Sequence, residues 1–274
     1  MSLNLPTIDG LSVALADGVV SITIDRAERR NALTNAMVHG LIDALDAAAA
    51  DDQARVVVLQ SSNDHFCSGA DIGAPTPKDV DGKTIKPRTG HMRAGLHSAP
   101  HRLITTVQES SLPVIAAVRG AAAGLGNALA LSADFVIASR TAKFWSPFVG
   151  RGFTPDSATT YMLPRLIGAA RARQMVLRST PIDGDTAASW GLVAEVVDDD
   201  QLDATVAALA AELAGAATVA VGLAKSLLYR NADATLSEAL YNEELAEELA
   251  IRSDDFKIGM KAFVTRTDAV FLGR

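Results

Sequence analysis

The sequence contains a single cysteine, Cys67, among 274 residues. One thiol cannot form an internal disulfide, which excludes a disulfide-stapled secreted scaffold and predicts a reducing, cytoplasmic location. Basic residues are also few, because 25 lysines and arginines stand against 32 aspartates and glutamates, for a net charge of −7. Such a chain has no basic stripe for a phosphate backbone, so nucleic acid is not expected as a main partner.

No uninterrupted apolar run is long enough to cross a membrane. The most apolar stretch, 114–138, is broken by Arg119, Ser132 and Asp134, and we expect it to be buried strand and helix. The first six residues lack the basic start and apolar stretch of a signal peptide. A phosphate-loop motif and a metal-ligand pattern are also missing, so no membrane partner, nucleotide or metal is predicted.

Hydrophobic residues make up 49% of the sequence, enough for a large core. Residues 11–16 and 19–24 alternate apolar and polar around Asp17-Gly18 and predict a β-hairpin. Further strands are predicted at 55–60, 113–118, 134–139 and 194–197, and helices from Thr34 and at 92–111, 124–132, 168–179, 202–214, 218–231 and 236–253. This pattern predicts an α/β core over 1–195 and a helical region over 196–274 as parts of one functional unit.

Two segments have a distinctive composition. Residues 73–90 are polar, with prolines at 75, 77 and 87, and predict a functional or mobile loop that can act as a lid. The glutamates at 238, 243, 244, 247 and 248 predict a solvated helix face.

Two glycine-rich loops are the first candidate site. They span 65–72 and 120–126, each follows a predicted strand, and the second opens a helix. Small residues let backbone N–H groups approach a ligand, and a helix N-terminus adds positive potential. Two such amides can hold an oxyanion, although each loop alone is more often a tight turn.

Several short motifs, in this order, resemble the crotonase superfamily, the enoyl-CoA hydratase/isomerase family. They are Ile24-Asp25-Arg26, Asn31-Ala32-Leu33, Phe66-Cys67-Ser68-Gly69-Ala70-Asp71-Ile72, 113–118 with Gly120 and Gly124, Ala142-Lys143-Phe144, 163–168, 187–193 and 259–263. The resemblance covers almost the whole chain. It implies a spiral of strand-strand-helix repeats with a C-terminal helical region that forms a homotrimer, or a dimer of trimers.

The same resemblance implies an acyl-CoA thioester substrate and no separate cofactor, because coenzyme A is part of the substrate. The thioester oxygen would accept from the amides of Ala70 and Leu125, which stabilises an enolate. Arg26, Arg29 and Arg30 would contact the CoA phosphates, although a role as charged residues of a solvated turn fits them equally well. The residues expected to bind substrate are Arg26, Arg29, Arg30, Ala32, Ser68, Gly69, Ala70, Asp71, Ile72, Gly73, Gly124, Ala128, Trp145, Phe148 and Phe263.

The acid/base residues of a family hydratase have no counterpart at the matching positions. Such an enzyme uses two glutamates around one water. Aligned by the flanking motifs, these positions are Ala128 and Phe148, and neither side chain can transfer a proton. Ordinary two-glutamate hydration is therefore not expected.

One carboxylate, Asp156, is present in the expected region. The segment Thr154-Pro155-Asp156-Ser157 resembles the Pro-Asp-Ser-Gly-Gly-Thr segment of phenylacetate-pathway-type enoyl-CoA isomerases, where the aspartate is the acid/base. Double-bond migration needs only one such group, so Asp156 is our predicted catalytic side chain. A helix N-cap is the competing role, and Ala158 and Thr159 replace the two glycines of the family segment.

The remaining candidates are weaker. We expect His91, His97 and His101 to be surface or packing histidines, with a proton shuttle as the less frequent role. Cys67 is expected to be a small packed residue. Three functions stay open: an enoyl-CoA isomerase, which we favour, a hydratase or lyase that uses another acid from 91–101, and a catalytically silent acyl-CoA-binding protein.

Overall fold

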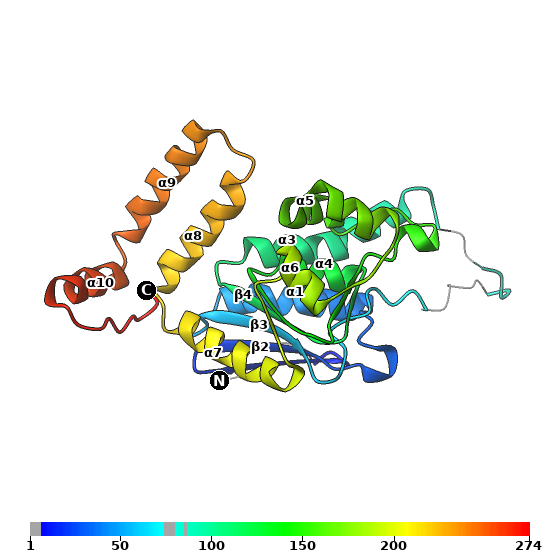
Figure 1. The fold of residues 1–274 in the computed structure, drawn as a ribbon, viewed down its shortest axis with the longest axis horizontal. Coiled ribbons are helices and arrows are strands. Elements are labelled where there is room, and N and C mark those ends of the chain that lie inside the picture. Colours follow the sequence, from blue (N-terminus) through cyan, green and yellow to red (C-terminus); the bar gives the residue numbers. More distant parts are fainter. Residues whose placement is uncertain (1–6, 74–79, 85–86) are drawn as a thin grey trace.

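The computed structural model describes residues 7–73, 80–84 and 87–274. A six-stranded sheet with the order β1-β2-β3-β4-β6-β9 lies at its centre (Figure 1). The strands are β1 (Leu11–Ala16), β2 (Val19–Ile24), β3 (Val56–Ser61), β4 (Val114–Val118), β6 (Phe135–Ser139) and β9 (Glu195–Val197). The predicted hairpin is confirmed: β1 and β2 are antiparallel, and Asp17 and Gly18 have the positive φ values, 51° and 79°, of a two-residue turn. All other neighbouring strands of this sheet are parallel.

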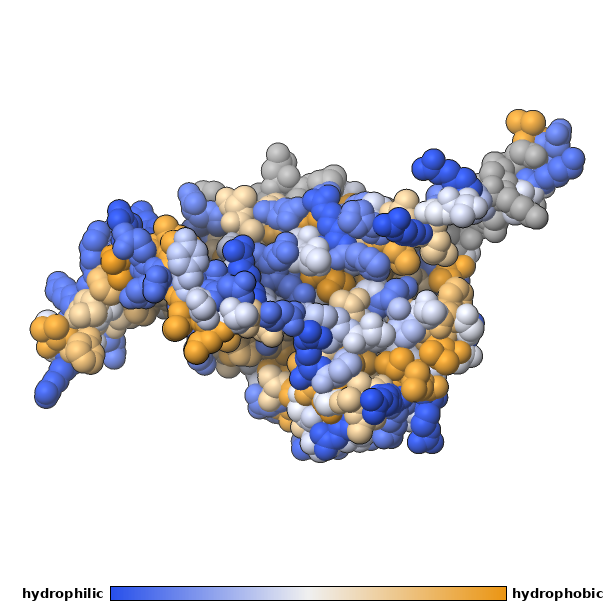
Figure 2. Space-filling model, turned by 90° about the horizontal axis from the view of Figure 1, so that it is seen from above, coloured by the Kyte–Doolittle hydropathy of each residue, from blue (hydrophilic) through white to orange (hydrophobic). Residues whose placement is uncertain are grey.

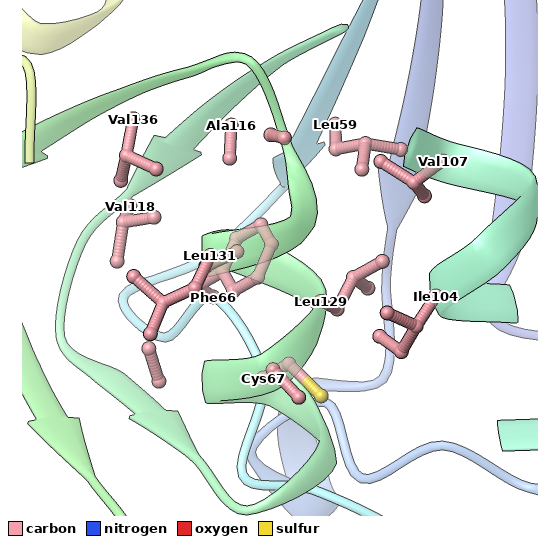
Figure 3. Close-up of a cluster of buried hydrophobic side chains, with 14 of the residues drawn as sticks. Leu59, Phe66, Cys67, Ile104, Val107, Ala116, Val118, Leu129, Leu131 and Val136 are labelled. Atoms are coloured by element: carbon pink, nitrogen blue, oxygen red, sulfur yellow. The ribbon is translucent and has the colours of Figure 1, made fainter. Parts of the chain in front are cut away.

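Helices cover both faces of the sheet. The helices α1 (Asn35–Ala49), α3 (Arg102–Glu109) and α4 (Leu125–Ser132) pack on one face, and α7 (Leu202–Ala214) packs on the other. Alternate residues of a strand face opposite layers, so Val57 and Leu59 join the larger core cluster while Val56 and Val58 face α7. Figure 3 shows part of the larger cluster around α4. The α1 prediction is confirmed at its cap, where Thr34 Oγ1 accepts from Met37 N at 3.2 Å.

A second, three-stranded sheet lies beside the first and was not predicted. It contains β5 (Ala121–Ala123), β7 (Lys143–Trp145) and β8 (Ile182–Asp183), in the order β5-β7-β8. Its strands have only two or three residues, too few for an alternating pattern. The sheet positions the start of α4, because only Gly124, the N-cap of α4, separates β5 from that helix.

Two helices differ from the sequence prediction. The helix expected at 92–111 is divided into α2 (His91–Leu96), a π-helical turn (His97–His101) and α3, with Pro100 inside the π turn. Proline has no N–H for the α-helical ladder, which explains the change of winding. The helix α5 (Thr159–Leu177) begins before the expected residue 168, where Gly168 has a φ of 75° and kinks the helix.

The C-terminal part contains α6 (Gly184–Trp190), α7, α8 (Thr218–Asn231), α9 (Leu236–Ala250) and α10 (Asp254–Thr265). The predicted α/β fold with a C-terminal helical region is confirmed. The boundary predicted between residues 195 and 196 falls inside β9. Helix α7, which lies in the predicted C-terminal helical region, packs against the six-stranded sheet. The α8–α9 hairpin and α10 stand away from the sheet (Figure 1).

The predicted lid, 73–90, includes residues 74–79 and 85–86, which lie outside the described residues, as do residues 1–6. The glutamates of α9 are exposed, as expected. Within the described ranges no single helix is long and apolar enough to span a membrane. A bent pair, Asp199–Ala214 with Thr218–Asn231, passes by length and composition, but α7 is packed on the sheet.

Candidate active site

The two glycine-rich loops are joined by backbone hydrogen bonds. Cys67 N donates to Ala121 O at 2.8 Å, and Ala123 N donates to Cys67 O at 2.9 Å, which pairs the first loop with β5. A side chain on Gly126 would overlap the Cys67 carbonyl oxygen, so α4 can approach this loop only with glycine there. The loops expected from the sequence to act together are therefore adjacent.

The first loop is also tied to Leu33. Leu33 N donates to Gly69 O, and Leu33 O accepts from Asp71 N, both at 2.8 Å. Ala70 therefore lies between Gly69 and Asp71, which are both hydrogen-bonded to Leu33. Gly69 has a φ of 108°, and a Cβ there would lie 2.8 Å from Ala123 O, so this position requires glycine for conformation and for space.

Two backbone amides at this junction have no acceptor within the part of the chain that the structure describes. Among the described residues, neither Ala70 N nor Leu125 N donates a hydrogen bond. A Cβ at position 69 would lie 3.6 Å from Leu125 N, which places the second amide beside the first loop. Leu125 is the first residue of α4, so its N–H is one of the helix's unsatisfied donors at the positive end of the helix dipole. An N–H group without a protein acceptor can donate to an anionic ligand.

Arg26, predicted to bind substrate, is engaged within the protein. Its Nη1 lies 2.7 Å from Asp71 Oδ2 and donates to Ala32 O at 2.9 Å. The guanidinium and the Gly73 amide hold the pKa of the Asp71 carboxyl below its usual range. Gly73 N donates to Asp71 Oδ1 at 2.9 Å.

The other expected substrate-binding residues of these loops are distributed around the same junction. Arg29, Arg30, Ala70, Ile72 and Gly73 are exposed, Ala32 and Ser68 are half-buried, and Gly69 and Gly124 are buried. Their predicted contacts with substrate stay predictions.

Apolar groups occupy the positions where the family resemblance places the hydratase glutamates. Ala128 is fully buried in α4. Phe148 is half-buried, and its ring would contact a Cβ at Gly124 at 3.9 Å. The Trp145 carbonyl accepts from Gly124 N, while its indole Nε1 donates to Ser179 O at 2.7 Å. The segment after β7 therefore packs directly against the start of α4.

Asp156 does not cap helix α5 with its side chain. The N-cap residue is Ala158, and α5 has no side-chain cap. The Asp156 carboxylate instead accepts from Ser157 Oγ at 2.8 Å, while the Asp156 backbone carbonyl accepts from Thr159 N at 3.0 Å. Asp156 is half-buried, and its carboxylate does not cap the helix.

Sequence patterns do not indicate the roles of three polar residues that neighbour candidate residues, namely Ser157, Asn31 and Asn127. Ser157 belongs to the family motif around Asp156, but the motif does not indicate the hydrogen bond between the two side chains. Asn31 is fully buried, and it connects Arg26 N, which donates to Asn31 Oδ1 at 2.7 Å, to the His65 carbonyl. The Asn127 amide is buried with no partner among the described residues, a state that ordinary sequence patterns do not signal.

Other candidates are not brought to this junction. Phe263 is 80% exposed on α10, at the far end of the molecule from α4 (Figure 1). His91, His97 and His101 are exposed, and no cluster of three metal-ligating side chains occurs within the described ranges. Cys67 is buried, and burial raises the pKa of its thiol to about 12, so it is a packed residue as expected.

The layered α/β fold is that of the crotonase class. The family described as Enoyl-CoA hydratase/isomerase matches residues 15–274, and the chain belongs to this family. It is 34% identical to 1,2-epoxyphenylacetyl-CoA isomerase of Escherichia coli over 94% of this chain and 96% of that protein. It is 36% identical to a probable enoyl-CoA hydratase of Rhodobacter capsulatus, over 95% and 96%. A structure of an enoyl-CoA hydratase/isomerase from Mycobacterium abscessus is similar with a TM-score of 0.86 and 36% identity, covering 96% of this chain and all of that one.

Proposed function

We propose that the protein is an enoyl-CoA isomerase in which one carboxylate, that of Asp156, moves a proton along the acyl chain of a CoA thioester. The observation that carries this proposal is the contrast between the two hydratase glutamate positions, on one side, and Asp156, on the other. Ala128 and Phe148 have no proton to transfer, whereas Asp156 is half-buried and free of a helix-capping role. A reaction that needs one acid/base fits this chain better than one that needs two.

The proposed reaction conserves atoms and electrons without a cofactor. The thioester oxygen of a 3-enoyl-CoA accepts from the Ala70 and Leu125 amides. Asp156 removes a proton from the carbon next to the thioester, and the electron pair moves onto the oxygen as an enolate. The carbonyl then re-forms, the double bond moves next to it, and the far carbon of the original alkene takes the proton back from Asp156.

Phe148 supports this assignment through solvent. Its half-buried ring lies against Gly124, at the start of the helix that carries the Leu125 amide. An aromatic ring there occupies space that a hydratase needs for its water. A drier site also strengthens the hydrogen bonds from the amides to the developing enolate.

The test supplies the purified protein with a 3-enoyl-CoA and a 2-enoyl-CoA in separate assays. We expect conversion of the 3-enoyl compound to the 2-enoyl compound, and Asp156→Asn should lower that rate by about 10²- to 10⁴-fold. The control is Asp200→Asn, at an exposed carboxylate beside α7, which should keep the wild-type rate. Hydration of the 2-enoyl compound that survives Asp156→Asn would instead support a hydratase with another acid. Binding without turnover of either compound would support a silent acyl-CoA-binding protein.

We further propose that the chain acts in the cytoplasm as a homotrimer or a dimer of trimers. Exposed apolar side chains on the C-terminal helices support the assembly, among them Leu228 at 77% and Phe263 at 80% exposure. Phe263 can approach a substrate only if it reaches the site of a neighbouring protomer, because its own protomer places it at the far end.

A further inference from the structure

The turn that precedes α1, residues 26–33, runs along the loop that carries Ala70. Ser68 N donates to Arg30 O at 3.0 Å, and Ser68 Oγ donates to Arg29 O at 3.1 Å. The bonds from Leu33 to the residues on either side of Ala70 continue this contact. The orientation of the Ala70 amide therefore depends on where this turn lies.

One ion pair connects the two ends of this contact. Arg26 stands at the start of the turn, and Asp71 follows Ala70 directly; their side chains are 2.7 Å apart, with 21% and 15% of their surface exposed. The Arg26 Nη1 that binds Asp71 also donates to Ala32 O, so one nitrogen holds the turn and the loop together. Asp71 uses its other oxygen to accept from Gly73 N, which fixes the chain beyond the amide.

We propose that Arg26 and Asp71 are positioning residues that hold the Ala70 amide in the direction required to polarise the thioester oxygen. This inference rests on the proposed use of the Ala70 amide. It assigns to Arg26 a different task from binding CoA phosphate, which needs a guanidinium free to leave the protein surface. Arg29 and Arg30, both exposed, are the cations of the turn that match the phosphate role.

The physical reason is that the reaction rate tolerates little error in the direction of the donor. A hydrogen bond to a developing oxyanion loses strength quickly when its donor rotates, and a misplacement of about 1 Å can cost about 100-fold in rate. The bond from Leu33 N to Gly69 O acts on the peptide plane that contains the Ala70 N–H, so the direction of this amide depends on how firmly the turn that carries Leu33 is held. A charge-assisted pair with little exposure supplies that restraint better than an ordinary surface ion pair.

The test uses Asp71→Asn and Arg26→Lys with two substrates that share one acyl chain, the CoA thioester and the N-acetylcysteamine thioester, which has no phosphates. We expect kcat to fall by about 10- to 100-fold with both substrates and KM to change little. A matched control is Asp46→Asn, which breaks an exposed pair with Arg102 at 3.3 Å and should leave kcat unchanged.

A spectroscopic readout separates positioning from general loss of structure. A dienoyl thioester bound to the wild-type protein should absorb at longer wavelength than in water, because the amides polarise its carbonyl. The shift should shrink in Asp71→Asn and Arg26→Lys while the thermal unfolding midpoint shows that both variants are folded. A defect confined to the CoA thioester, or an unchanged spectrum and kcat, would overturn the inference. If the wild-type protein turns over neither enoyl compound, the proposed function fails, while the spectra still decide the role of this pair.

Discussion

At the scale of single residues, the segment that carries Asp156 contains unusual backbone conformations. Ser157 and Ala158 have φ values of 50° and 60°, in the left-handed region that favours glycine. The family segment has glycine at the position of Ala158, and the structure explains that preference. Thr159, at the second glycine position, is the first residue of α5 and needs no such freedom. Only one of the two departures from the family pattern therefore strains the backbone.

Replacing Ala158 by glycine should relieve this strain. A non-glycine residue in the left-handed region costs about 1–2 kcal/mol, part of which is offset by the greater entropy of glycine in the unfolded chain. We expect Ala158→Gly to raise the free energy of unfolding by about 0.5–1 kcal/mol, measured by urea denaturation. Thr160→Gly, at an exposed helical position two residues later, should have the opposite sign. Equal effects of the two changes would contradict the argument.

At the scale of elements, helix α8 is attached to the core by a buried lysine. Lys225 Nζ donates to Val107 O at 2.9 Å and to Leu112 O at 3.0 Å, and it lies 2.8 Å from Asp134 Oδ2. The same carboxylate oxygen accepts from Val114 N at 2.7 Å. Burial lowers the pKa of Lys225 and raises the pKa of Asp134, and the attraction between the two opposes both shifts.

Removing this lysine should loosen α8. Lys225→Met leaves the Asp134 carboxylate buried and unpaired, so we expect a loss of about 3–5 kcal/mol in the free energy of unfolding. Adding Asp134→Asn should restore part of that loss. The comparison variant is Lys257→Met, which removes an exposed pair with Asp254 at 3.0 Å and should not change stability measurably. Urea denaturation measures stability, and amide hydrogen exchange shows whether α8 is the element that opens; unchanged exchange there would exclude this attachment.

The elements also show what the sequence can predict. The β1–β2 hairpin and α1 are set by local signals, Asp17-Gly18 and Thr34, and both predictions are confirmed. Strand β5 consists of three alanines, which have no strand preference of their own, and it is extended because it pairs with β7 and with Cys67. Local patterns do not contain such tertiary pairing.

The same distinction applies to the candidate site. The two loops follow from glycine spacing and family resemblance, and the structure brings them together. The ion pair between Arg26 and Asp71 joins residues 45 positions apart, and nothing local in the sequence indicates it. Only the family resemblance groups Phe263 with the site, and a single protomer does not place it there.

At the scale of the whole molecule, the C-terminal helices present apolar side chains that a lone chain leaves in water. Leu228, Phe263 and Val264 are each at least 74% exposed, and Figure 2 shows apolar groups on the projecting part of the molecule formed by these helices. Groups of exposed apolar side chains are typical of protein interfaces. These side chains lie on the helices that stand away from the six-stranded sheet.

Sedimentation should give a mass about three or six times that of the 28.6 kDa chain. Phe263→Asp should lower this mass, because a charge would be buried at the interface. Val80→Asp, which changes a fully exposed apolar side chain outside the C-terminal helices, is the control and should leave the mass unchanged. A wild-type protein that sediments as a single chain would contradict the proposed assembly.

The paired donors of Ala70 and Leu125 belong to the main chain, and this affects how the protein can change by mutation. Every residue except proline supplies an N–H, so almost any side-chain substitution at these two positions preserves the donor itself. A point mutation can delete or replace an acid/base such as Asp156, but it cannot delete a backbone amide in the same way. New reactions in this fold can therefore arise from changes in side chains while the two donors are inherited unaltered.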